Sequence, residues 1–125
     1  MQYFLSLGSN INAKKNIQFA IGELKEIFSD FRSSSIYQTK AEGFEGEDFL
    51  NLVTSGISEL SFTSLNKKLK SIEDLAGRDR NGPKFGSRTL DIDIVLQIDG
   101  QNEIVFESDE VQKYKFVSEP LKELI

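Results

Sequence analysis

The chain has 125 residues, of which 38% are hydrophobic and 28% are charged, and its formal net charge at pH 7 is −5. This length and composition predict one globular domain over residues 1–125, and the acidic balance argues against general nucleic-acid binding, which rests on summed positive charge. Cysteine and histidine are both absent from the sequence. Disulfides, thiolate or imidazole catalysis and histidine-ligated zinc are therefore excluded, and any metal site must be built from oxygen ligands.

The first half of the chain reads as strand, helix, strand and loop. Residues 2–7 alternate in polarity, which is typical of a strand. Asn12 is expected to cap a helix that runs to about Phe28, with one apolar stripe made of Ile17, Ile21, Leu24 and Phe28. A serine-rich strand is expected over residues 31–39 and a loop over residues 40–47.

The second half repeats the pattern. A strand is expected over residues 49–58, and Ser61 or Thr63 is expected to cap a second helix that stops at Gly77. A strand over residues 89–98, a hairpin turn at Asp99-Gly100 and a returning strand over residues 103–106 complete the regular elements.

The tail from Ser108 is charged and gives no clear pattern, although Phe116, Val117 and Leu121 could anchor it and Pro120 is expected to interrupt it. The order of elements before it is strand–helix–strand–strand–helix–strand. This order predicts an α+β fold, a ferredoxin-like sandwich with two main helices on one face of an antiparallel sheet. The fold alone does not name a function.

One stretch, residues 73–94, carries the strongest chemical signal. A glycine-containing loop with four cationic side chains is followed by a strand on which Asp91 and Asp93 point to the same face, about 7 Å apart at Cα. Two carboxylates beside guanidinium groups favour a site for a magnesium-bound polyphosphate. The alternative is an ordinary basic loop beside a solvated strand face. The known phosphate-binding loop motifs do not match, because Pro83-Lys84 stands where lysine and a hydroxyl residue are required.

Asn51 is a second candidate, because it shares a strand face with apolar neighbours. Its amide is either satisfied by the backbone or aimed at a ligand, and the pattern leaves both open.

The segment Gly86-Ser87-Arg88-Thr89-Leu90-Asp91-Ile92-Asp93-Ile94 resembles the signature of the hydroxymethyl-dihydropterin pyrophosphokinase family of folate biosynthesis. Four other fragments occur in the family's order: Leu7-Gly8-Ser9-Asn10, Tyr37-Gln38-Thr39, Phe49-Leu50-Asn51, and Ile72-Glu73 with Gly77-Arg78. The likeness covers about residues 3–96.

The resemblance implies transfer of pyrophosphate from ATP, the co-substrate, to the hydroxymethyl group of a dihydropterin, with release of AMP. It implies that two magnesium ions bind Asp91 and Asp93, and that Asp93 also helps to take the hydroxyl proton. Arg78 and Arg88 would act catalytically on the phosphates. The implied ATP-binding set is Glu73, Arg78, Arg80, Phe85, Arg88 and Ile94, and the implied pterin-binding set is Thr39, Phe49, Asn51 and Phe116.

The sequence departs from the family pattern near its end. Glu107-Ser108 and Tyr114 stand where the family has a Pro-His pair and a basic residue, and Lys113 and Lys115 are the nearby cations that could partly replace them. Ser87 replaces a proline, and the end at Ile125 implies a shortened C-terminal part of the fold. Two other functions stay open: a catalytically weakened pterin- or nucleotide-binding homologue, and an unrelated ferredoxin-like regulatory module.

The start of the chain has no basic leader, and no apolar run reaches the length of about 18 residues that a membrane span needs. We therefore expect a soluble, cytoplasmic monomer whose partners are its small-molecule substrates, with no membrane and no nucleic acid among them.

Overall fold

The computed structural model describes residues 1–40, 46–77 and 89–125. In chain order its elements are β1 (Gln2–Ser9), α1 (Ala13–Ile27), β2 (Ser29–Ser33), β3 (Tyr37–Thr39), β4 (Phe49–Ile57), α2 (Phe62–Leu75), β5 (Asp91–Ile98), β6 (Ile104–Glu107), α3 (Glu110–Lys113) and α4 (Lys115–Lys122). Within these ranges, none of the helices is both long enough and apolar enough to span a bilayer.

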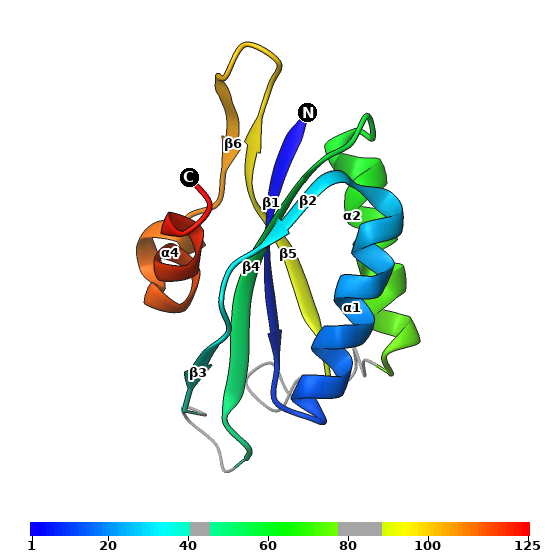
Figure 1. The fold of residues 1–125 in the computed structure, drawn as a ribbon, viewed down its shortest axis with the longest axis vertical. Coiled ribbons are helices and arrows are strands. Elements are labelled where there is room, and N and C mark those ends of the chain that lie inside the picture. The colour runs from blue at the N-terminus through cyan, green and yellow to red at the C-terminus, as the bar shows by residue number, and fades with distance from the viewer. Residues whose placement is uncertain (41–45, 78–88) are drawn as a thin grey trace.

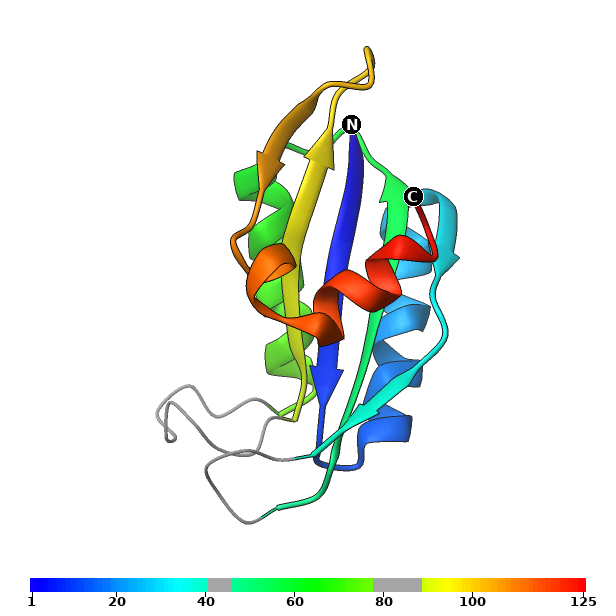
Figure 2. The same ribbon diagram turned by 90° about the vertical axis from the view of Figure 1, so that its left-hand side faces the viewer.

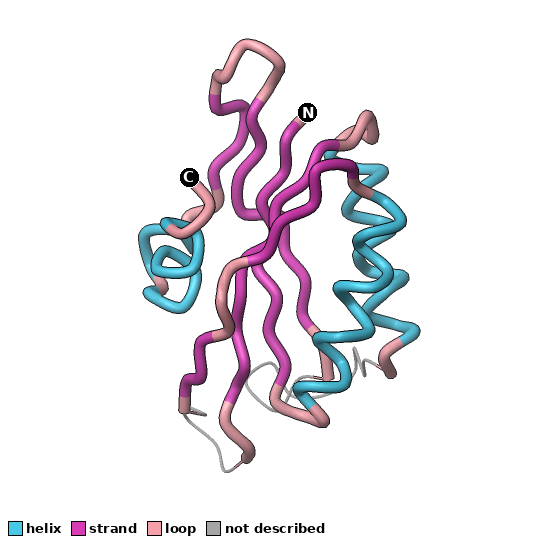
Figure 3. Tube along the Cα trace, viewed as in Figure 1, coloured by secondary structure: helices cyan, strands magenta, loops and turns pink. Residues whose placement is uncertain are grey.

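The described strands form one antiparallel sheet in the order β2-β4-β1-β5-β6, and β3 pairs with β4 beside β2. Helices α1 and α2 lie side by side on one face of the sheet, while α3 and α4 cross the other face (Figures 1 and 2). The predicted α+β, ferredoxin-like arrangement is confirmed, and the C-terminal helices add a third layer to it. Figure 3 shows the same layers by secondary structure.

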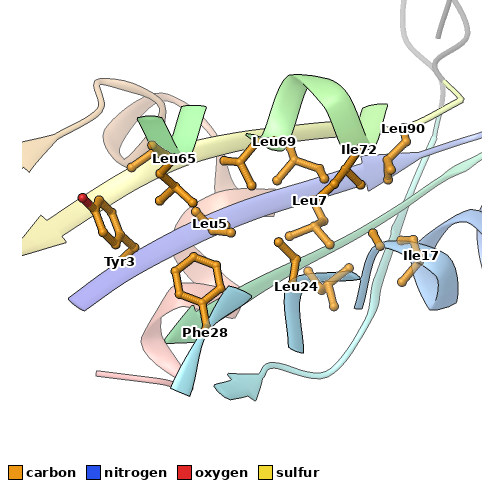
Figure 4. Close-up of a cluster of buried hydrophobic side chains, with 14 residues drawn as sticks. Tyr3, Leu5, Leu7, Ile17, Leu24, Phe28, Leu65, Leu69, Ile72 and Leu90 are labelled. Atoms are coloured by element: carbon orange, nitrogen blue, oxygen red, sulfur yellow. The ribbon is translucent and has the colours of Figure 1, made fainter. Parts of the chain in front are cut away.

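The larger core lies between the sheet and the two long helices (Figure 4). Alternation along β1 sends Tyr3, Leu5 and Leu7 to this side, and all three are fully buried. They meet the apolar stripes of the two helices, whose buried members are Ile17, Ala20 and Leu24 on α1 and Leu65, Leu69 and Ile72 on α2.

A second, smaller core lies on the opposite face, under α4. It joins Phe4, Val53, Val95 and Leu96 of the sheet to Val117 and Leu121 of the helix. Val95 is an extra residue in β5, because Phe4 pairs with Leu96 whereas Leu5 pairs with Ile94. This bulge puts both Val95 and Leu96 into the second core, so β5 supplies side chains to both layers.

The helix ends agree with the predicted positions. The Ser61 hydroxyl accepts a hydrogen bond from the Ser64 backbone N–H at 3.2 Å, and Gly77 ends α2 with a φ of 91°. Asn12 is the N-cap residue of α1, as expected, but its backbone is left-handed and its side chain makes no capping hydrogen bond. The side-chain amide of Asn16 instead donates to the Ile11 carbonyl at 2.6 Å.

Three expected boundaries need correction. The single strand over residues 31–39 is two strands, because regular pairing stops over residues 34–36, where the Ser34 N–H still donates to the Val53 carbonyl oxygen at 2.8 Å. The hairpin turn spans Asp99 to Glu103, and Asn102 takes its left-handed position. Pro120 does not interrupt the tail: it is buried inside α4, where its ring packs and only one helical hydrogen bond is forgone.

Candidate functional site

The sheet register aligns candidate residues in one row. Tyr37 pairs with Asn51, Asn51 pairs with Gly8, and Gly8 pairs with Asp91. Directly opposed residues of antiparallel strands point to the same face. Gly8 is four residues after Phe4 on β1, and Phe4 packs against α4, so the row runs across β3, β4, β1 and β5 on the face that carries α4. Figure 2 shows α3 and α4 crossing this face of the sheet.

Asp91 and Asp93 share this face of β5. They alternate with Ile92 and Ile94, whose side chains are buried in the core on the helix side. Both aspartates are partly exposed, and the Asp93 side chain retains 42% of its accessible surface. Two carboxylates therefore lie on one open strand face, the arrangement that an oxygen-ligated cation needs.

Glu73 is placed differently from the aspartates. Its side chain is fully buried on α2, and its carboxylate accepts a hydrogen bond from the Ile92 backbone N–H at 2.7 Å. Lys70, one turn earlier, lies 3.2 Å from the same carboxylate and 3.4 Å from the Ile92 carbonyl oxygen. β6 pairs with β5 from Leu96 to Ile98. The Glu73 and Lys70 side chains bind the same edge of β5 at Ile92, before β6 begins to pair with it.

Lys70 also links this edge to the candidate metal ligands, because its Nζ lies 3.5 Å from Asp93 Oδ1. Its charge offsets part of the negative charge of the aspartate pair. The ion pair is half exposed, so its own contribution to stability is small.

The candidate pterin-reading residues meet on β3 and β4. The Asn51 side-chain amide is buried and donates to the Thr39 hydroxyl at 2.8 Å. Phe49 pairs with Thr39 at the same end of the sheet and is partly buried. The sequence left two interpretations of Asn51 open, and the structure is compatible with both. Its Nδ2 has a protein partner, the Thr39 hydroxyl, while the residue lies in the row shared with Gly8 and Asp91.

Gly8 lies between Asn51 and Asp91 in the row and places no side chain there. A Cβ at this position would lie 3.0 Å from Asn51 Oδ1 and 4.0 Å from the Leu50 carbonyl oxygen. A Cβ here would need the Asn51 side chain to shift by a few tenths of an ångström, so this close approach favours glycine.

Phe116 comes to this face from α4 and is partly buried against the second core. Its ring stacks on that of Tyr114, with centroids 4.8 Å apart and planes 19° apart. Lys113, the neighbouring cation, forms an exposed ion pair with Asp109 at 3.3 Å.

Glu110 was not singled out by the sequence, yet it lies among these groups. Burial and then the nearby charge of Asp93 raise the pKa of its carboxyl group above the ordinary value, and Asp91 contributes further. The Ser108 hydroxyl donates to this carboxylate at 3.4 Å. No periodicity or motif signals this approach, because it arises from how α3 folds back over β5. Within the described ranges, no three carboxylates are close enough to form a metal site.

Several predicted residues are not brought to this face. Ile94 is buried in the helix-side core, and Glu73 is enclosed at the strand edge. A cavity of about 490 Å³ lies between the start of α1 and the end of α2, lined by Ile11, Asn12, Lys15, Asn16, Phe19, Leu75, Ala76 and Thr89, none of which is a predicted site residue. The predicted residues Arg78, Arg80, Phe85 and Arg88 lie outside the described residues.

Comparison with known proteins gives a family match over most of the chain. Residues 4–125 match the family model described as 7,8-dihydro-6-hydroxymethylpterin-pyrophosphokinase. A protein of Aquifex aeolicus named 2-amino-4-hydroxy-6-hydroxymethyldihydropteridine pyrophosphokinase is 38% identical over 98 residues, and one of the same name from Synechocystis sp. is 36% identical over 127 residues. A folate synthesis bifunctional protein of Arabidopsis thaliana is 31% identical over 129 residues.

These alignments cover 77%, 96% and 97% of the chain, respectively. They cover 61%, 64% and 26% of the three relatives. The chain thus spans less than two thirds of the length of each of these curated relatives.

Proposed function

Because the chain belongs to the 7,8-dihydro-6-hydroxymethylpterin-pyrophosphokinase family, we propose that it transfers pyrophosphate from ATP to 6-hydroxymethyl-7,8-dihydropterin and releases AMP. The pterin hydroxyl oxygen forms a bond to the β-phosphorus of ATP. The bond between that phosphorus and the oxygen shared with the α-phosphate breaks, AMP leaves, and the hydroxyl proton passes to a base.

One observation carries this proposal. Asn51 and Asp91 lie in the same cross-strand row, separated only by Gly8, so the residue proposed to bind the heterocycle and the residue proposed to bind the cation face the same space. A substrate held at Asn51 would direct its substituent toward β5. This is the geometry that bringing an acceptor hydroxyl against a metal-bound polyphosphate requires.

The donor set fits magnesium, since Asp91 and Asp93 offer carboxylate oxygens on one partly exposed face. These two residues would hold two magnesium ions, which when bound supply neutralisation of the phosphate oxygens. The Lys70 ammonium group lies 3.5 Å from the Asp93 carboxylate and forms an ion pair with it.

The chain's other residues bind and orient. Asp93 accepts the hydroxyl proton in this proposal, and Arg78 and Arg88 stabilise charge on the transferring and leaving phosphates, with Arg80 and Phe85 on the same segment. Asn51 and Thr39 bind the polar edge of the pterin, and Phe49 and Phe116 cover its two faces. Lys113 and Lys115 add point charges near the nucleotide, where the family has an arginine fork.

The test is to incubate the chain with ATP, magnesium and hydroxymethyl-dihydropterin and to measure AMP. We expect AMP from the wild type and a loss of at least about a hundredfold in rate for Asp91→Asn and Asp93→Asn, because each removes a charged ligand of the cation. Asp30→Asn is the matched control, since Asp30 is exposed on β2 and its left-handed backbone suits asparagine. AMP formation that survives both aspartate changes would contradict the assignment.

A second candidate function is a pterin- or nucleotide-binding homologue with weakened catalysis. It is favoured by Ser108 and Tyr114, which stand where the family's histidine and basic residue contact phosphates. Binding of pterin and nucleotide without AMP formation would support it over the first.

A further inference from the structure

The C-terminal end of α4 is fastened to the strand edge on the far side of the candidate site. The Glu123 carboxylate, just after the last helical residue, accepts hydrogen bonds from the Ser35 backbone N–H at 2.9 Å and from the Ser35 hydroxyl at 2.7 Å. The Tyr37 hydroxyl donates to the same carboxylate. One exposed side chain thus gathers three donors from the β2–β3 segment.

A backbone contact adds to this set. The Arg32 guanidinium donates to the Leu124 carbonyl oxygen at 2.6 Å. The four contacts cross between segments that are about 90 positions apart in the chain, as the separations of 86, 88 and 92 residues record. We call Glu123 with Ser35, Tyr37 and Arg32 the tail latch.

The titration behaviour of the two partners agrees with a charged acceptor. Hydrogen bonds from Ser35 lower the pKa of the Glu123 carboxyl group, and the bond to Glu123 raises the pKa of the Tyr37 hydroxyl group. The carboxylate is therefore ionised at neutral pH, and a charged acceptor forms stronger hydrogen bonds than a neutral one.

The latch joins the two elements that carry candidate pterin-binding residues, β3 and α4. Tyr37 is the outer member of the row that continues through Asn51 and Gly8, and it lies two residues before Thr39 on β3. Phe116 is seven residues before Glu123, so the two lie on about the same side of the helix, roughly 10 Å apart along its axis.

We propose that Glu123 is a positioning residue for pterin binding: it holds α4 against β3 and so fixes Phe116 relative to the strand face that carries Asn51 and Thr39. The inference rests on the proposed function for the identity of the ligand. In this inference the tail latch sets the distance between the Phe116 ring and the Asn51 amide. A flat ligand must fit that distance to stack on the ring and hydrogen-bond to the amide at once.

A purely structural role would act differently. Val117 and Leu121 already anchor α4 in the second core, so loss of the latch leaves the helix attached but free to shift at its C-terminal end. Because α4 has only eight residues, such a shift tilts the whole helix, moves Phe116 at its start and changes the affinity for a ligand under that ring. It leaves Asp91 and Asp93 on β5, which bind the cation in the proposal, where they are.

The experiment compares Glu123→Gln with Glu26→Gln, a matched change at an exposed position of α1 on the opposite face. Glutamine keeps the shape but has one accepting oxygen and no charge, so it cannot satisfy all three donors. We expect Kd for 6-hydroxymethylpterin, measured with magnesium and a non-hydrolysable ATP analogue, to rise about fivefold in Glu123→Gln. The Kd for the analogue alone should change less than twofold, and Glu26→Gln should match the wild type in both titrations.

Two further measurements make the outcome decisive. Hydrogen exchange at α4 amides should be faster in Glu123→Gln than in Glu26→Gln. The effects of Ser35→Ala and Glu123→Gln on pterin affinity should be non-additive, since both changes weaken the bond between the Ser35 hydroxyl and Glu123. Unchanged pterin affinity together with faster exchange in α4 would overturn the positioning role. If the wild type binds no pterin, the proposed function fails and this role fails with it, whereas the exchange comparison still reports whether the latch holds the helix.

Discussion

Gly8 is the smallest element of the candidate site and one of the most restrictive. In Gly8→Ala the new methyl group would lie 3.0 Å from Asn51 Oδ1, so the Asn51 side chain must move and its bond to Thr39 is strained. We expect pterin affinity to fall about tenfold, the equivalent of one hydrogen bond of about 1.4 kcal/mol. Titrations of Gly8→Ala with pterin and, separately, with an ATP analogue check this: the affinity for pterin should fall and the affinity for the analogue should stay unchanged.

Gly22→Ala is the control for that change. A Cβ at Gly22, in the middle of α1, meets nothing within 4 Å. Alanine there should raise the free energy of unfolding by about 0.5–1 kcal/mol and leave both affinities unchanged. A Gly8→Ala protein that binds pterin like Gly22→Ala would show that Asn51 is not a pterin contact.

Glu110 gives a prediction about pH. Because burial and the charges of Asp93 and Asp91 raise the pKa of its carboxyl group, the ionised form disfavours folding, and stability falls as pH rises through that raised pKa. Glu110→Gln should therefore stabilise the metal-free protein at pH 7, by about 0.5 kcal/mol or less since the group is partly exposed. The gain should vanish as the pH is lowered to the ordinary range of a glutamate, where the wild-type group is protonated as well.

Urea denaturation at pH 7 and pH 4 without magnesium measures this difference, with exposed Glu107→Gln as the control. A stabilisation by Glu110→Gln that is as large at pH 4 as at pH 7 would exclude charge as its cause.

At the scale of elements, the edge of β5 depends on α2. The Glu73 carboxylate is buried and accepts from the Ile92 N–H at 2.7 Å, while Lys70 donates to the Ile92 carbonyl. Glu73→Ala would leave a buried N–H without its acceptor and remove a charge that Lys70 pairs with, so we expect a loss of about 2–3 kcal/mol in the free energy of unfolding.

Glu73→Gln is the informative companion, because the amide oxygen can still accept from Ile92. It should recover part of the loss in urea denaturation, and hydrogen exchange at the Ile92 amide should rank Ala above Gln above wild type. Equal exchange rates in all three proteins would show that the strand edge does not depend on this contact.

Local periodicity predicted the elements that depend on it. The stripe of α1 and the alternation of β5 are local, and they placed Ile17, Leu24 and the Asp91–Asp93 pair on the observed faces. The break between β2 and β3 was missed because the serine-rich run has no residue that marks it, and the tail was missed because Pro120 reads as a helix breaker although its buried ring packs inside α4.

The site itself could be predicted only in its parts. That Asp91 and Asp93 share a face follows from a period of two, but that Gly8 lies between Asn51 and Asp91 depends on the register of three strands far apart in the chain. The approach of Glu110 and the binding of Glu123 to Ser35 likewise depend on how α3 and α4 cross the sheet. Such long-range placement leaves no pattern in the local sequence.

At the scale of the whole molecule, two cores support two different parts of the proposed reaction. Leu69 is fully buried in the larger core between the sheet and the long helices, and Leu121 is buried in the smaller core under α4. Leu69→Ala should destabilise the entire domain by about 2–5 kcal/mol, because it opens a cavity beneath the central strands. Leu121→Ala removes a similar amount of buried apolar surface, but the smaller core attaches only the C-terminal helices to the sheet.

We therefore expect Leu121→Ala to speed hydrogen exchange chiefly in α4 and to lower pterin affinity about tenfold, through Phe116, while ATP-analogue affinity changes less than twofold. Leu69→Ala should speed exchange throughout β1, β4 and β5 and, at temperatures where it remains folded, bind both ligands nearly as the wild type does. Comparing the two variants therefore distinguishes the C-terminal layer, which affects the binding of one substrate, from the larger core, which determines the stability of the whole domain. If Leu121→Ala instead raised exchange evenly across the sheet, the two cores would be one cooperative unit, and α4 could not tune pterin binding independently of the rest.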